Sequence, residues 1–148
     1  MAKKVEFYKK SLLKEMWKNG SSVKYTIKCD KKVIETYIPF LAVKSLFFKD
    51  MFESTTQNFV EITDFQFEVL QKMIEFCETD DIKGVNGYEC ELFKAAHKYQ
   101  MNDLMDFVVE KMSEDADDSN IFSYLQLAKK YELKEFEKWC MKFAFRTM

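Results

Sequence analysis

The feature that most constrains the fold is an apolar stretch that ends at residue 52. Residues 40–52 read FLAVKSLFFKDMF, and in a helix these apolar side chains would point to almost every side. A helix of this kind cannot leave one whole face in water, so it must be covered on most sides or lie at an interface. Pro39 marks its start, because proline is tolerated in a first helical turn. We therefore expect two short helices, 41–44 and 45–52, at the buried centre of one domain.

The composition indicates a single ordered domain that is mostly helical. The chain has 148 residues, of which 47% are hydrophobic and 32% charged, enough for one real core. With 3 glycines and 1 proline, few tight turns are expected. The net charge of −2 argues against a nucleic-acid partner and against an anionic membrane surface, since both need a basic surplus. No apolar run is long enough for a membrane span.

The cysteines and the N-terminus predict a reducing compartment. Cys29, Cys77, Cys90 and Cys140 lie far apart and form no Cys-x-x-Cys motif, which favours buried free thiols. The first residues contain no apolar core typical of a signal peptide. We therefore expect a cytoplasmic or nuclear location.

The first half of the chain predicts one helix followed by a small sheet. Residues 5–18 form a wide apolar stripe that would pack either on the chain's own core or on a partner subunit. Residues 22–29 alternate between apolar and polar, and with 32–38 they predict a β-hairpin that turns at Asp30-Lys31. A short third strand is expected at 59–62.

The second half predicts helices only. A helix is expected from Thr63 or Asp64 to about residue 78, with Thr63 and Gln66 at capping-box spacing. Further helices are expected at 88–99, 102–113, 120–131 and 133–145, with an acidic connection at 114–118. The motif at 96–107, AHKY followed by Phe107, returns at 128–139 as AKKY followed by Trp139, an offset of 32 (128 − 96). This indicates two helical hairpins of one design, which is fewer than a solenoid needs.

Taken in order, these motifs resemble a BTB/POZ domain. The resemblance rests on a hairpin, the motif Ser45-x-x-Phe48-x-x-Met51-Phe52, a third strand, a helix near Asp64-Phe65, and Ala95-Ala96-x-x-Tyr99-x-x-x-x-Leu104. It implies an α+β fold, with a small three-stranded sheet flanked by helices. Residues 1–113 would form the domain with an N-terminal dimerisation helix, and 114–148 a helical pair similar to the 3-box of speckle-type POZ (MATH-BTB) adaptors.

The resemblance also implies two interaction surfaces and no catalytic role. It implies a dimer, of the chain with itself or with another BTB protein, and an adaptor for a cullin-3 ubiquitin ligase. The basic residue of the usual dimer centre would be Lys44, whose acidic partner is replaced at about Val23. The dimer surface would comprise Phe7, Leu12, Leu13, Trp17, Lys44, Ser45 and Phe48. The cullin surface would comprise Glu53, Ser54, Thr55, Gln57, Asn58, Tyr99, Gln100, Met101, Asn102, Leu104 and Tyr131.

Two functions remain open from the sequence. Cullin-binding members often carry an apolar-x-Glu motif after the position of Phe52, and the loop 53–58 has none. That absence favours an alternative, an assembly protein that pairs with itself or with another BTB protein and binds no cullin. An enzyme is not expected: His97 is the only histidine, no cofactor motif is present, and the cysteines lack the spacing of a zinc site. We interpret His97 as a structural or surface residue.

Overall fold

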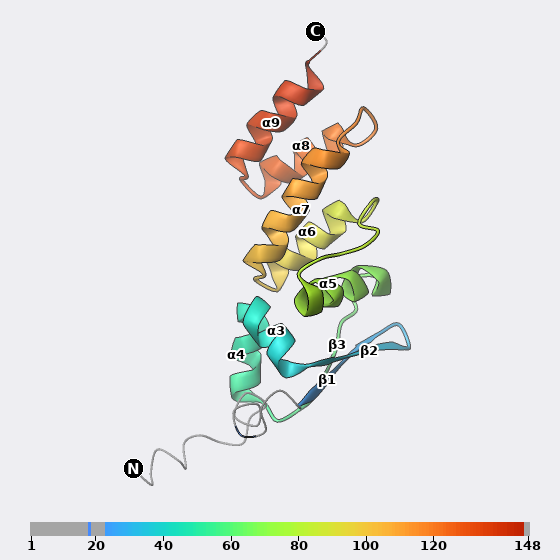
Figure 1. Ribbon diagram of the computed structural model, residues 1–148, viewed down its shortest axis with the longest axis vertical. Coiled ribbons are helices and arrows are strands. Elements are labelled where there is room, and N and C mark those ends of the chain that lie inside the picture. The colour runs from blue at the N-terminus through green and yellow to red at the C-terminus, as the bar shows by residue number, and fades with distance from the viewer. Residues whose placement is uncertain (1–17, 19–22, 147–148) are drawn as a thin grey trace, which may run out of the picture.

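The computed structural model describes Lys18 and residues 23–146, and these form an elongated molecule (Figure 1). The sheet lies at one end and the last two helices lie at the other. Between them, the helices follow one another along the long axis in nearly the order of the sequence. The α+β class and the small sheet that we expected are confirmed.

Within the described residues, one sheet has the strand order β2-β1-β3. Strands β1 (Lys24–Cys29) and β2 (Lys32–Tyr37) are antiparallel, and β3 (Phe59–Glu61) runs parallel to β1. The hairpin turns at Asp30 and Lys31, which both have a positive φ, as a two-residue hairpin turn requires. Tyr25, Ile27 and Cys29 are buried, so the predicted alternation of β1 is confirmed.

The apolar stretch forms two helices, α3 (Ile38–Lys44) and α4 (Leu46–Ser54). Strand β2 ends one residue earlier than we expected, because Ile38 already belongs to α3. Ser45 separates the helices and caps α4, accepting a hydrogen bond from the Phe48 backbone N–H at 3.0 Å. Its hydroxyl also donates to the Tyr99 carbonyl at 2.6 Å, which joins the start of α4 to the end of α6.

Helix α5 (Phe67–Thr79) packs over the sheet (Figure 1), and Thr36 of β2 donates a 2.7 Å hydrogen bond to Glu78. The predicted capping box at Thr63 is wrong. The helix begins at Phe67, its cap position is Gln66, and no side chain bonds to the cap. The buried face of α5 includes Leu70, Met73, Ile74 and Cys77, whereas Phe67 is only partly buried.

The remaining helices form two hairpins with the same internal register. The first hairpin comprises α6 (Glu89–Lys98) and α7 (Asn102–Asp115), and the second comprises α8 (Ile121–Lys130) and α9 (Lys134–Ala144). Helices α6, α7 and α8 begin at 89, 102 and 121, and α9 at 134, so both hairpins keep the offset of 32 residues. The Met101 N–H bonds to the Ala96 carbonyl at 2.8 Å, and the Leu133 N–H bonds to the Ala128 carbonyl at 2.8 Å. The repeat predicted from sequence is therefore a repeat of structure.

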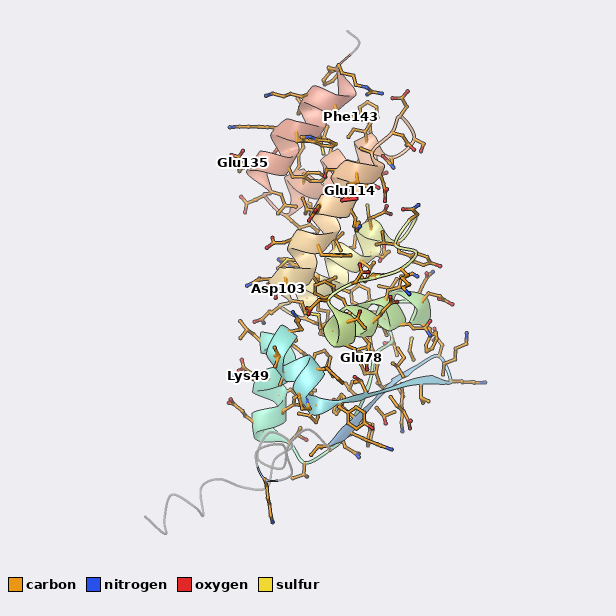
Figure 2. The ribbon with its side chains drawn as sticks, in the orientation of Figure 1. Lys49, Glu78, Asp103, Glu114, Glu135 and Phe143 are labelled. Atoms are coloured by element: carbon orange, nitrogen blue, oxygen red, sulfur yellow. The ribbon has the colours of Figure 1, made fainter. Side chains whose placement is uncertain are left out.

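Each hairpin places a tyrosine on the unit before it. The Tyr99 ring stacks on Phe48 of α4 at 5.1 Å between centroids, and the Tyr131 ring lies 5.1 Å from Phe93 of α6. One core runs from the sheet through both hairpins, ending at Cys140. In Figure 2, Phe143 of α9 lies at the far end of the molecule from the sheet.

Candidate interaction surfaces

Four apolar side chains on and beside α3 remain exposed, and we call them the α3 patch. Phe40 and Val43 lie three residues apart in α3 and so share one side of that helix, while Tyr37 is the last residue of β2 and Leu46 the first residue of α4. Val43 is 80% exposed and Leu46 53%, and the Tyr37 and Phe40 rings contact each other edge to face. A run of apolar side chains on one surface is typical of a protein–protein contact.

The predicted dimer residues are only partly at this surface. Ser45 and Phe48 are buried in the core of the chain itself, so their assignment to an interface does not agree with the structure. Phe7, Leu12, Leu13 and Trp17 lie outside the described residues. The exposed residues Phe40, Val43 and Leu46 are not among the residues predicted for the dimer surface. The apolar character of residues 40–52 on all sides was the sequence signal that allowed an interface here.

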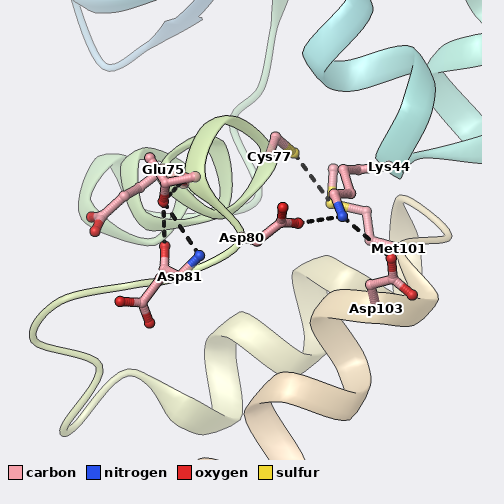
Figure 3. A network of polar contacts seen from close by, with 8 residues as sticks. Lys44, Glu75, Cys77, Asp80, Asp81, Met101 and Asp103 are labelled. Carbon is pink, nitrogen blue, oxygen red and sulfur yellow. Dashed lines mark hydrogen bonds and ion pairs between the residues drawn. The ribbon is translucent and has the colours of Figure 1, made fainter.

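Lys44 has two acidic partners within its own chain, neither of them at the first-strand position near Val23 where the family's usual partner would lie. Its ammonium group forms ion pairs with Asp80, at the C-terminal end of α5, and with Asp103 in the first turn of α7, the latter at 3.3 Å (Figure 3). The hydrogen bond to Asp80 is the largest cause that raises the pKa of Lys44, and Asp103 adds to it. The ammonium group also lies 5.5 Å from the centre of the Phe76 ring. Lys44 therefore ties α3 to α5 and α7 within one chain.

The predicted cullin surface divides into exposed and buried residues. Glu53, Ser54, Gln57, Asn58, Gln100 and Asn102 are exposed, while Thr55 and Tyr131 are half-buried. Tyr99, Met101 and Leu104 are buried, and their direct contact with a partner does not agree with this burial. The two predicted segments sit at opposite ends of α4. Residues 53–58 follow the C-terminal end, and Gln100 accepts a 3.4 Å hydrogen bond from the Leu46 N–H at the other end.

No catalytic arrangement is assembled around the candidate side chains. The exposed His97 ring lies 4.7 Å from the Tyr131 ring, which is a structural contact between the hairpins. All four cysteines are free, and burial raises the pKa of Cys77 to about 12 and that of Cys140 to about 11. Among the residues described, no group of histidine, cysteine and carboxylate side chains could hold a metal ion. No helix in the same part of the chain is long and apolar enough to cross a membrane.

Comparison with known proteins supports the family resemblance. The family model described as BTB/POZ domain matches residues 13–116. The structure is similar to the BTB domain of zebrafish PATZ1, with a TM-score of 0.55 and 19% identity over 70% of this chain and 86% of that one. It is also similar to the BTB domain of human gigaxonin, with a TM-score of 0.52 and 14% identity over 66% of this chain and 82% of that one. At these identities, the likeness concerns the fold.

Proposed function

The chain belongs to the BTB/POZ domain family, a family of protein–protein interaction modules, and from this premise we propose that it self-associates through the α3 patch. The single observation that carries the proposal is the exposure of the four apolar side chains on and beside α3, Tyr37, Phe40, Val43 and Leu46. Covering these side chains in a symmetric dimer would remove apolar surface from water, which stabilises the assembly.

Internal ion pairs support the use of α3 as a rigid contact surface. Lys44 holds the C-terminal end of α3 against α5 and α7, and Ser45 fixes the following turn to Tyr99. A surface whose backbone is already fixed loses little conformational entropy when it binds. The α3 patch is therefore preorganised for binding to the same patch in a second copy of the chain or to a similar patch in another BTB protein.

The experiment is a measurement of mass in solution by light scattering. We expect the wild-type protein to have twice the chain mass of 17.7 kDa, and the variants Val43→Glu and Leu46→Glu to have the mass of one chain. Val33→Glu is the matched control, because Val33 is 55% exposed on β2 but lies outside the patch. A wild-type monomer, or a control that dissociates as completely as Val43→Glu, would contradict the proposal.

A role as a cullin-3 adaptor is the second candidate, and the in-register second hairpin favours it. A helical pair that follows the BTB/POZ domain supports the resemblance to the 3-box of the adaptors, and Tyr131 of this pair packs on α6. The missing apolar-x-Glu motif in the loop 53–58 favours the alternative, in which the protein assembles without a cullin.

Titration calorimetry with a purified cullin-3 N-terminal domain distinguishes the adaptor from the protein that assembles without a cullin. An adaptor would bind, and Gln57→Lys and Asn102→Lys would weaken binding because both side chains are exposed on the predicted surface. Gln71→Lys, at an exposed position of α5, is the control. Absence of heat from a wild-type protein that is still dimeric would leave assembly alone as the function.

A further inference from the structure

The repeat identifies the face of α7 that lies beside the second hairpin. On α7, the side chains of Asp106, Val109, Glu110 and Ser113 line a groove together with the α8–α9 turn and the start of α9, including Leu133, Lys134 and Phe136. This face of α7 thus borders the second hairpin, which packs on the first mainly through α6 and Tyr131. Lys134, in the first turn of α9, lines the groove together with the acidic side chains Asp106 and Glu110 of α7.

The equivalent face of α9 has no such neighbour among the residues described. Adding 32 to each α7 position gives Lys138, Met141, Lys142 and Phe145, and we call these residues together with Lys134 the terminal face. A groove of ≈ 460 Å³ on this face is lined by Lys134, Glu137, Lys138, Met141 and Lys142. Met141 is 40% exposed and Phe145 46%, whereas Val109, the counterpart of Met141, is partly buried against the core. Figure 1 shows α9 at the end of the stack of helices.

The charge of the terminal face is the reverse of the charge on α7. The acidic pair Asp106 and Glu110 is replaced at the same repeat positions by Lys138 and Lys142. Within the part of the chain that the structure describes, neither lysine forms an ion pair, although the whole chain is acidic, with a net charge of −2. An occupant that continued the repeat geometry would therefore meet lysines at the positions where the groove beside α9 is lined by carboxylates.

We propose that the terminal face binds an acidic amphipathic helix of a partner protein. Carboxylates in the first turn of that helix would pair with Lys138 and Lys142, in a position that also favours negative charge at a helix N-terminus. An apolar stripe on the same helix would cover Met141 and Phe145. The flexible methionine side chain can adapt to different apolar residues, so the face suits a class of acidic helices.

The test uses the full chain and a synthetic helix as probe. The probe is an alanine-rich peptide of about 15 residues, long enough to be partly helical in water, with glutamates beside a stripe of leucines. Methionine methyl groups are labelled with ¹³C, so that Met141 reports binding and the buried Met112 serves as the internal reference. We expect a saturable shift of the Met141 resonance, and an affinity about tenfold lower for the variant Lys138→Glu/Lys142→Glu.

Charge exchange provides the decisive control. A peptide with lysines in place of its glutamates is expected to bind Lys138→Glu/Lys142→Glu more tightly than it binds wild type. Lys49→Glu/Lys83→Glu makes the same change in net charge at two exposed positions away from α9, and it should bind the acidic peptide like wild type. Circular dichroism shows whether each variant is folded.

Four outcomes would overturn the proposal. The first is no shift of Met141, and the second is an equal loss of affinity in the control variant. The third is a Met141 shift that depends on protein concentration alone, which would make a second copy the occupant. The fourth is binding to phosphatidylcholine–phosphatidylserine vesicles without binding to the peptide, which would assign the lysines to an anionic membrane surface.

Discussion

Single residues in this protein join elements that are distant in sequence, and Lys44 is the clearest case. Its stem is mostly buried, with a side chain 17% exposed, while its two acidic partners are 69% and 70% exposed. An ion pair between a fixed cation and solvated carboxylates contributes little energy by itself. The ion pairs of Lys44 instead determine how the helices are placed, because one ammonium group holds the ends of α3, α5 and α7 at a common point (Figure 3).

Beside this ion pair, the Cys77 thiol gives a prediction about alkaline pH. Burial raises the pKa of Cys77 from its ordinary 9.0 to about 12. In the unfolded chain the thiol ionises near its ordinary pKa, whereas in the folded protein it stays protonated. The stability from this group is thus full below about pH 9 and is lost as the pH rises toward the folded pKa.

Replacing Cys77 should remove this part of the alkaline loss. Between about pH 7 and about pH 10, we expect the free energy of unfolding of Cys77→Ala to fall by ~1 kcal/mol less than that of wild type. Urea denaturation at the two pH values measures the difference, and comparing each protein with itself cancels the cost of the cavity. Equal losses in both proteins would show that the thiol ionises without regard to folding.

At the scale of elements, the sequence predicts most of the fold because the signals are local. Three such signals are confirmed: the alternation in β1, the turn at Asp30-Lys31 and the repeat at an offset of 32. Each is read from a short segment of sequence. The predicted start of α5 is wrong, since β3 ends at Glu61 and the chain uses residues 62–66 to pass from the sheet to the helix.

The interface residues could not be predicted in the same way. When a helix is apolar on every side, its sequence does not show which face is buried. The sequence therefore could not distinguish Phe48, which is buried, from Val43, which is 80% exposed. Tertiary packing, such as that of Phe48 on Tyr25 and Tyr99, decides which side remains outside. The same reasoning applies to Met101 and Leu104, whose place in the core depends on tertiary contacts.

The two helical hairpins share a strained turn, and this gives a prediction for both. Gln100 has a φ of 53° and Glu132 a φ of 56°, in the left-handed region that costs a residue with a side chain roughly 1 kcal/mol. We expect Gln100→Gly and Glu132→Gly each to raise the free energy of unfolding by ~0.5 kcal/mol, and the valine variants to lower it by more than that. Urea denaturation of the four proteins checks the order. Valine variants as stable as wild type would show that the turn relaxes out of this conformation.

For the whole molecule, stacking along one axis implies that stability differs between its ends. Tyr99 is 3% exposed, and its ring contacts Phe47 and Phe48 of α4 and Phe65 of the segment between β3 and α5. The second hairpin rests on the first through the half-buried Tyr131, whose ring contacts Phe93 and His97. Units that contact only their neighbours have stabilities set by their own contacts and by the shared interface.

Truncating the two equivalent tyrosines should therefore have different consequences. We expect Tyr99→Ala to lower the global free energy of unfolding by ~3 kcal/mol, because it empties a buried aromatic site. Tyr131→Ala should instead release the second hairpin, so that amides of α8 and α9 exchange hydrogen about tenfold faster or more, while those of α5 change little. Hydrogen exchange read by mass spectrometry, together with urea denaturation, measures both effects. If Tyr131→Ala accelerated exchange equally in α5 and α9, the two hairpins and the sheet would unfold as one cooperative unit, and the inference of a locally separable second hairpin would be wrong.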